Sequence, residues 1–359
     1  MSTTTHIEWT ERTWNPVVGC TRVSAGCDHC YAVRMSHRLR RTKEYAGLTV
    51  LNDRGDRHFN GTVRCLPERL SDPLHWRKPC RVFVNSMSDL FHEKVPFEFI
   101  DKVFAVMALC PQHTFQILTK RPERMADWCA IPNDPARSGR FTWMGNLVRG
   151  KHLPLPNVWL GTSVEDQATA DERIPHLLRC PAAARFLSVE PLLEAVDLTL
   201  HLQRPCDPEG HIGMGIDWVI VGGESGPGAR PMHPDWVRSI RDQCQAASVP
   251  FFFKQWGAWA PTDDDNMPNA PWRHLRDDGA LGILNGRHGP QVVDLKARPD
   301  ECDSSRPGQH LTPNGNIVCM SLYGKKAAGA VLDGREWREY PDGNTETSKR
   351  RDAEKGSTP

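Results

Sequence analysis

Six short apolar segments recur along the chain, and their regular spacing restricts the fold more than any other feature of the sequence. Each has four to six residues, is rich in β-branched or aromatic side chains, and is apolar on both faces. Strands of a parallel sheet that is covered by helices on both sides have this pattern. Successive segments begin roughly 27 to 43 residues apart, the length of a strand–helix unit with modest insertions. The six expected strands are residues 81–85, 114–118, 157–160, 184–189, 217–221 and 249–253.

Helical periodicity fills the intervals between these segments. Apolar residues recur at spacings of three and four between 100 and 107, and again between 237 and 247. A further strand is expected at 14–18, which brings the total to about seven strand–helix units. The sequence therefore predicts an α/β fold, a partial or closed TIM-like (β/α) barrel. A doubly wound open sheet is the alternative.

Polar side chains follow each expected strand. In a parallel barrel all these strand ends open onto one face, where active sites are built. Any single polar residue at such a place is usually structural, but six successive strand ends with this character indicate a functional face. The candidates are Ser86, Ser88, Asp89, Lys120, Arg121, Ser163, Glu165, Glu190, Glu224, Arg230 and Lys254.

Three of the 12 cysteines are clustered in a loop directly after the first expected strand. Cys20, Cys27 and Cys30 have the spacing C-x6-C-x2-C, and Gly19 and Gly26 flank the segment. Glycine lets such a loop fold back, so that three thiolates converge on one ion or cluster. Three sulfur ligands leave one coordination position open, which favours an iron–sulfur cluster over a structural zinc site with four ligands.

Other interpretations of the three cysteines stay open. His29 or His37 could complete a Cys3His zinc site, and free cysteines also occur in ordinary cores. A zinc hydrolase with a metal-bound water is a third alternative, although three thiolates make a poor Lewis acid for water.

The rest of the composition describes a globular chain. No apolar run approaches the roughly 18 to 20 residues that cross a bilayer, and the first residues lack the pattern of a secretory signal. We therefore expect a cytoplasmic protein that contacts no membrane. Disulfides are rare in that compartment, so the other nine cysteines are expected to be ordinary thiols.

The formal net charge of +1 hides a strong local bias. Residues 34–81 contain 12 Lys and Arg against five Asp and Glu. Such a basic segment beside the cysteine loop suits the phosphate backbone of DNA or RNA, although basic runs are often only solvated faces. The expected nucleic-acid contacts are Arg38, Arg40, Arg41 and Lys43.

Many co-linear motifs between residues 7 and 341 resemble one known family. They include Trp-Asn-Pro-x2-Gly-Cys, the cysteine loop, NSMSDLFH, ILTKRPERM, GTSVE, LSVEPL, VGGESGPGARP, FFKQWG and KKAAGAVLDGREW. The chain is similar to the phage Gp37/Gp68-type proteins, which are radical-SAM-like. The resemblance implies a barrel that carries a [4Fe–4S] cluster on Cys20, Cys27 and Cys30, with S-adenosylmethionine on the fourth iron. A likeness to spore photoproduct lyase suggests a nucleic-acid substrate.

The resemblance also implies roles for the strand-end residues. Ser86, Ser88 and Asp89 would contact the amino group of the cofactor, and Ser163, Glu165 and Glu190 its ribose and carboxylate. Lys120, Arg121, Glu224, Arg230 and Lys254 would act in catalysis or on the substrate. Two features depart from the radical SAM pattern: the first cysteine gap is six residues instead of three, and the Gly-Gly-Glu motif follows the sixth strand instead of the second.

The expected organisation has three parts. Residues 1–259 form the barrel, with a basic insertion at about 42–80. Residues 260–341 form a loop-rich extension that docks on the barrel, with a helix at 325–332, and 342–359 are a disordered tail.

Two functions are carried forward from the sequence. The first is a radical-SAM-like enzyme that modifies or repairs a nucleic-acid base, with a ferredoxin or flavodoxin as electron donor. The alternative is a non-catalytic nucleic-acid-binding protein that zinc or an iron–sulfur cluster stabilises.

Overall fold

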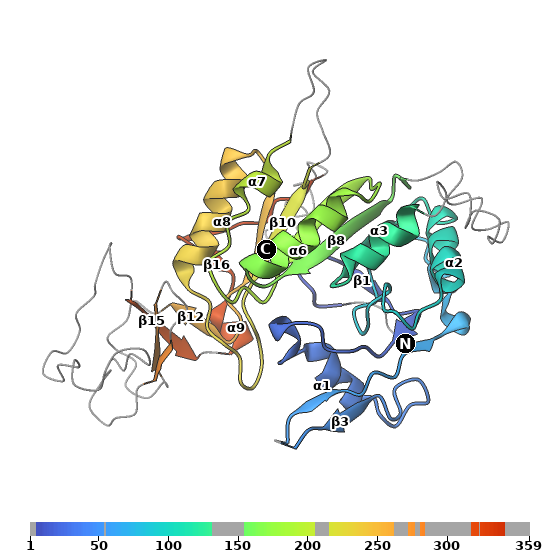
Figure 1. Ribbon diagram of the computed structural model, residues 1–359, viewed down its shortest axis with the longest axis horizontal. Coiled ribbons are helices and arrows are strands. Elements are labelled where there is room, and N and C mark those ends of the chain that lie inside the picture. Colours follow the sequence, from blue (N-terminus) through green and yellow to red (C-terminus); the bar gives the residue numbers. More distant parts are fainter. Residues whose placement is uncertain are drawn as a thin grey trace, which may run out of the picture. The chain divides into compact units, whose positions relative to one another are not determined.

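Seven strands form the main sheet, and their order in the sheet is their order along the chain. The computed structural model describes residues 5–53, 55–130, 154–204, 215–261, 272–276, 281–283, 317–322 and 324–341 (Figure 1). The strands are β1 (Arg12–Trp14), β6 (Arg81–Val84), β7 (Thr114–Thr119), β8 (Val158–Val164), β9 (Ala184–Val189), β10 (Trp218–Gly222) and β11 (Phe251–Gln255).

The pairings support the predicted fold class. The pairs β1–β6, β6–β7, β7–β8 and β10–β11 are parallel. A doubly wound sheet reverses its strand order at a switch point, whereas this sheet keeps the sequential order of a (β/α) barrel. The α/β prediction is confirmed, and the sheet is consistent with a partial TIM-like fold. All six apolar segments that were expected as strands lie in this sheet.

The first expected strand, at 14–18, is the one that was wrong. The sheet strand β1 ends at Trp14, and β2 (Val17–Val18) pairs antiparallel with β5 (Arg64–Cys65) outside the main sheet. Pro16 separates the two pieces, and proline cannot donate a ladder hydrogen bond. Valine-rich composition identified a strand here, but the proline divides it.

The chain divides into two compact units, which are described separately. Unit 1 comprises Met1–Val164, Ala168–Ser188 and Arg204–Ile216, and unit 2 comprises Glu165–Gln167, Val189–Gln203 and Asp217–Pro359. The boundary expected at residue 259 stays a prediction.

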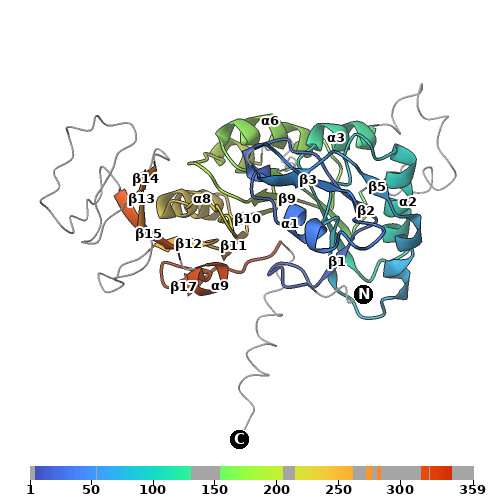
Figure 2. The same cartoon turned by 90° about the horizontal axis from the view of Figure 1, so that it is seen from below.

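The helices of unit 1 follow the predicted alternation. They are α1 (Tyr31–Arg38), α2 (Phe97–Ala108), α3 (Pro122–Ala130) and α6 (Gln167–Leu178), whose first residue belongs to unit 2. Figures 1 and 2 show α2, α3 and α6 side by side along the strands of unit 1. The apolar face predicted at 100–107 is buried, with Ile100, Val103 and Met107 fully inaccessible.

The basic insertion folds beside the cysteine loop as a small layer of its own. It contains the hairpin β3 (Thr49–Leu51) and β4 (Arg57–Phe59), and the single turns η2 (Pro67–Arg69) and η3 (Asp72–His75). A small core anchors the layer, and its buried members are Val18, Ala32, Tyr45, Leu48, Leu66 and Met87.

Close packing of β8 against a side chain of β9 requires a glycine on β8. A Cβ atom at Gly161 on β8 would lie 2.6 Å from the ring of Phe186 on β9. The same ring contacts Trp9, which contacts Phe83 in turn, with centroid distances of 6.2 and 4.8 Å. These three aromatic side chains are buried beneath the strand ends.

Unit 2 holds the last two strands of the main sheet and several smaller elements. The helices are α7 (Thr199–Leu202), α8 (Pro234–Ala246) and α9 (Lys325–Ala328). A second, antiparallel sheet has the order β12 (Trp259–Pro261), β15 (Ile317–Leu322), β13 (Trp272–Arg276) and β14 (Leu281–Ile283), and β16 (Val331–Leu332) pairs with β17 (Arg335–Glu336). The loop-rich extension therefore contains a sheet that the sequence did not predict. Most of residues 262–316, and the tail expected at 342–359, lie outside the described residues.

The C-terminal part of unit 2 returns to the main sheet. Trp337 is 6% exposed, its ring lies 5.9 Å from Phe251, and its carbonyl accepts a hydrogen bond from the Phe253 amide. The helix expected at 325–332 is shorter than predicted, because α9 is followed by Gly329 at φ 70° and then by β16. No helix within the described ranges is long and apolar enough to cross a membrane.

Candidate functional site

The cysteine loop connects β2 to α1 in unit 1. It begins after Gly19, whose φ is 85° and where a Cβ would lie 2.1 Å from the Thr62 carbonyl oxygen. Only glycine fits this conformation and this approach. The turn η1 (Ala25–Cys27) crosses the loop, and Cys30 occupies the N-cap position of α1.

The three thiols form one electrostatic cluster. Burial raises the pKa of Cys20 to about 12, and the charges of Asp89 and Cys30 act in the same direction. Burial likewise raises the pKa of Cys30, to which the charge of Cys27 contributes. Cys30 therefore interacts electrostatically with both other cysteines. That all three hold one group stays a prediction.

Lys120 lies at the end of β7 with its ammonium buried beside two of these thiols. Burial lowers the pKa of Lys120, while the charges of Cys27 and Cys30 oppose that change. Burial alone would raise the pKa of Cys27, but Lys120 and hydrogen bonds from the Val23 and Ser24 backbone lower it overall. A buried cation thus faces a thiol that ionises more readily than an ordinary cysteine.

Arg121, the next residue, reaches the third thiol. Its Nη1 donates to Asp89 Oδ2 at 3.0 Å and lies 3.9 Å from Cys20 Sγ, and its Nη2 donates to Thr21 Oγ1 at 2.6 Å. The side chains of Arg121 and Asp89 are 12% and 7% exposed. This pair joins the end of β7 to the segment after β6 and to the cysteine loop.

Asp89 is held by four protein donors. Its Oδ1 accepts from Thr119 Oγ1 at 2.7 Å and from the Phe91 amide at 2.9 Å. Its Oδ2 accepts from the Lys120 amide at 3.0 Å in addition to Arg121. The predicted contact of Asp89 with a cofactor stays a prediction, and its carboxylate orients the residues that surround the thiols.

Ser86 and Ser88 are also engaged within the protein. Ser86 Oγ donates to Asn15 Oδ1 at 3.2 Å, and Ser88 Oγ donates to the Val17 carbonyl at 2.7 Å. Their roles toward a cofactor stay a prediction. Both hydroxyls hold the chain that enters the cysteine loop.

Ser163 and Glu165 lie at the end of β8 and are buried, at 4% and 0% exposure. Arg173, which is buried on α6, donates to the Ser163 carbonyl at 2.9 Å. Ser163 belongs to unit 1 and Glu165 to unit 2.

The strand ends of unit 2 carry two ion pairs. Lys254 Nζ lies 2.7 and 2.8 Å from the two carboxylate oxygens of Glu190, and Gln255 Nε2 lies 3.3 Å from Oε1. Arg230 binds both carboxylate oxygens of Glu224, at 2.9 Å through Nε and 2.6 Å through Nη2. The structure thus pairs four of the predicted site residues with each other.

His92 and Thr21 also belong to the cysteine-loop cluster, and neither was among the predicted site residues. His92 is fully buried; its Nδ1 accepts the Lys94 amide at 3.1 Å, and its Nε2 lies 2.9 Å from Thr21 Oγ1. Burial and then the Arg121 charge lower the pKa of His92, while the charges of Glu93 and Asp89 oppose that change. The sequence carried no signal for His92, because a lone histidine has no ligand spacing.

The donor set fits a thiolate-bound group in its chemistry. Three thiols lie within one electrostatic cluster, and Lys120 and Arg121 supply positive charge against thiolates. Across the described ranges, no three His, Cys, Asp or Glu side chains already have the geometry of a metal site. A group bound by the three cysteines therefore requires the loop to draw the sulfurs together. The Cys3His zinc arrangement through His29 or His37 is likewise not assembled.

The comparisons with known proteins give a family but no activity. A family model described as "Protein of unknown function (DUF5131)" matches residues 4–341. No curated protein matches the chain. A solved structure of a spore photoproduct lyase mutant is similar at 11% identity with a TM-score of 0.37, and the match covers 68% of this chain and 63% of that one. The chain thus spans less than two thirds of that protein, and a likeness this low carries no argument about function.

Proposed function

The chain belongs to the protein family of unknown function DUF5131, so membership supplies no activity, and we propose one from the site itself. The protein is an iron–sulfur enzyme of the radical SAM type. Cys20, Cys27 and Cys30 hold a [4Fe–4S] cluster, and S-adenosylmethionine is the second cofactor. The single observation that carries this proposal is the cluster of three thiols beside the buried cations Lys120 and Arg121.

The charges around the thiols support a thiolate-bound group. Three thiolates in a buried setting repel one another, and each pays a desolvation cost. Lys120 offsets this cost at Cys27 and Cys30, and Arg121 offsets it at Cys20. Three cysteines with two cations nearby form a better anionic ligand set than three cysteines in an apolar core.

The protein residues have separate tasks in this proposal. Lys120 and Arg121 stabilise the deprotonated thiols, and Asp89 fixes Arg121 and the Lys120 amide. Thr21, between Arg121 and His92, holds the first turn of the loop. The bound group would supply one-electron reduction of S-adenosylmethionine and hence a radical that removes hydrogen from the substrate.

The test begins with anaerobic reconstitution of the full chain with iron and sulfide. We expect a brown protein that absorbs near about 400 nm, as [4Fe–4S] clusters do. Incubation with dithionite and S-adenosylmethionine should then release 5′-deoxyadenosine and methionine. A colourless protein that binds one zinc ion per chain contradicts the proposal at its first step.

A second candidate is a non-catalytic nucleic-acid-binding protein that its metal stabilises. The basic residues that follow Cys30 favour this candidate, because they could bind phosphates without any reaction at the cysteine loop. It predicts a cluster or zinc site whose removal lowers the melting temperature, with no release of 5′-deoxyadenosine under any reductant.

A further inference from the structure

A basic and partly apolar surface follows the cysteine loop directly. On α1, Tyr31, Met35 and Arg38 lie four and three residues apart, so they share one face of the helix. Tyr31 is 46% and Met35 40% exposed. The turn after the helix adds three more exposed basic side chains. We call this set the α1 surface; it comprises Tyr31, Met35, Arg38, Arg40, Arg41 and Lys43.

The arginines of the α1 surface are not neutralised by neighbouring carboxylates, whereas the charge of Lys43 acts on the adjacent Glu44 carboxyl. Within the part of the chain that the structure describes, Arg38, Arg40 and Arg41 form no ion pair. Arg40 donates only to the His37 carbonyl, at 2.9 Å. The arginines of α8 differ, because Arg238 and Arg241, whose side chains are 42% and 14% exposed, both bind Asp333. The α1 surface therefore has unbalanced charge where another exposed helix of the same chain has balanced charge.

Another strand adds positive charge at the same place. The pKa of His37 is lowered by desolvation first, and then by the charges of Arg40 and of Arg57 on β4. The guanidinium groups of two separate elements thus lie near one helix. Arg64, on β5, donates to the carbonyl of Glu44, the residue that follows Lys43, at 2.8 Å.

The aromatic ring at the start of α1 is fixed in place. The Tyr31 hydroxyl donates to the Ser86 carbonyl at 2.5 Å, while the opposite face of the helix is buried through Ala32, Val33 and Ser36. A ring that is anchored at its hydroxyl and half exposed loses little entropy when a flat group stacks on it.

We propose that the α1 surface binds single-stranded nucleic acid. Arg38, Arg41 and Lys43 contact phosphates, and a base stacks on Tyr31, the combination that single-strand binding uses. Because Tyr31 follows Cys30, a nucleotide bound there lies next to the cysteine loop. The proposal that the α1 surface binds a strand does not require the cluster. Only the inference that the bound strand is the substrate rests on the proposed function.

The experiment measures binding of a fluorescent 20-nucleotide oligo(dT) to the full chain by anisotropy, between 50 and 200 mM salt. The logarithm of the association constant falls with the logarithm of the salt concentration, and each phosphate contact contributes about 0.7 to the steepness of that fall. The double variant Arg38→Gln/Arg41→Gln should therefore make the slope shallower by about 1.4. Affinity of this variant should fall about tenfold at the lowest salt. Tyr31→Ala should weaken binding at least about fivefold and leave the slope unchanged, since stacking is not ionic.

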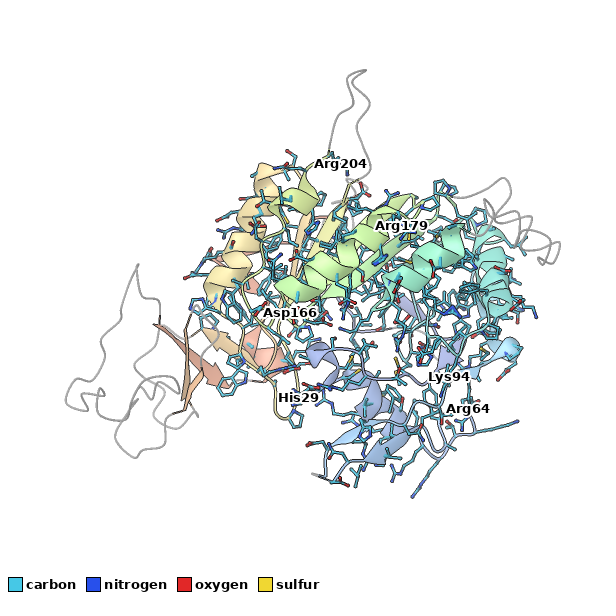
Figure 3. All side chains as sticks on the ribbon, in the orientation of Figure 1. His29, Arg64, Lys94, Asp166, Arg179 and Arg204 are labelled. Carbon is cyan, nitrogen blue, oxygen red and sulfur yellow. The ribbon has the colours of Figure 1, made fainter. Side chains whose placement is uncertain are left out.

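The matched control removes two exposed cations elsewhere in unit 1. Lys102→Gln/Arg179→Gln changes the net charge equally, and Figure 3 labels Arg179, which directly follows α6. Affinity of the control should stay within about twofold of the unaltered chain. Circular dichroism verifies that each variant is folded.

Three results would overturn the proposal. They are no binding of oligo(dT) by the unaltered chain, an equal loss in the control, or equally tight binding to vesicles containing phosphatidylserine with the same dependence on Arg38 and Arg41. The absorbance spectrum and iron content of the same preparation report the cluster separately. A failure of the α1 surface is therefore distinguishable from a failure of the proposed enzyme.

Discussion

The two units place charged residues at their strand ends in opposite ways. In unit 2, Glu190 pairs with Lys254 and Glu224 with Arg230, so each charge is satisfied by a neighbouring side chain. In unit 1, Lys120 lies beside the thiols of Cys27 and Cys30. Arg121 pairs with the carboxylates of Asp89 and Glu93 and also reaches Thr21 and the thiol of Cys20. Carboxylate partners complete an ion pair, whereas thiols can exchange a proton for a metal. A charged residue at a strand end therefore indicates a functional site when the side chain beside it is a group, such as a thiol, that can also bind a metal.

The largest expected effect is loss of the bound cluster, which only substitutions in the cysteine loop of unit 1 should cause. Cys20→Ser, Cys27→Ser and Cys30→Ser should each abolish the absorbance near about 400 nm after reconstitution, because a hydroxyl is a poor ligand for iron in such a cluster. Cys65→Ser, on β5 of unit 1, and Glu190→Gln, in unit 2, should leave the iron content unchanged. Iron analysis on all five variants tests the comparison, and retention of the cluster in any loop variant would contradict it.

The second effect concerns stability and belongs to unit 2. Glu224→Ala leaves the Arg230 guanidinium without its carboxylate and should lower the free energy of unfolding by about 2 to 3 kcal/mol. This loss is smaller than the roughly 3 to 5 kcal/mol that removing one partner of a fully buried ion pair costs. The reason is that the Arg230 side chain is 31% exposed. Urea denaturation of Glu224→Ala, Arg230→Ala and the double variant gives the coupling energy between them. Additive losses would show that the two residues do not act as a pair.

The smallest effect is a difference in thiol reactivity in the metal-free protein. The pKa of Cys27 is lowered, whereas burial raises the pKa of Cys65 and of Cys244 on α8 of unit 2. Because the thiolate is the reactive form, iodoacetamide should alkylate Cys27 first, and its rate should level off at a lower pH than the rate at Cys65. Mass spectrometry at a series of pH values measures each rate. Equal pH profiles for Cys27 and Cys65 would refute the role assigned to Lys120, and reconstitution with iron should protect Cys20, Cys27 and Cys30 but not Cys65.

The strands of the main sheet were predicted well because each of the six segments is a short apolar run that is recognisable from its own residues. The segment at 184–189 has the predicted bounds, and the other five differ by a few residues at their ends. The end of β6 shows why the ends of strands are harder to predict: Asn85 directly follows the apolar residues Val82, Phe83 and Val84 but has φ 63° and leaves the strand. The four-stranded sheet of unit 2 was missed because its strands β13 and β14 lie in a segment rich in Pro, Gly, Asp and Asn.

The site was predictable in its residue types but not in its partnerships. The cysteine spacing and the run Thr119-Lys120-Arg121 were visible in the sequence. Nothing local reveals that Asp89 binds Arg121, since 32 residues separate them. Similarly, Glu190 and Lys254 looked like candidate site residues because their pairing spans 64 residues. Which charges neutralise one another is set by tertiary structure alone.

Cys30 has a consequence that extends beyond the loop. It is the last of the three cysteines and also the N-cap of α1, so a ligand that holds its sulfur also restrains the first turn of the helix that carries Tyr31. An α-helix frays from its ends because initiating a turn is costly, and a restrained first turn suppresses that fraying. Occupancy of the cysteines and affinity of the α1 surface would then be thermodynamically linked. By reciprocity, a bound strand would strengthen retention of the cluster by the same factor by which the cluster strengthens binding of the strand.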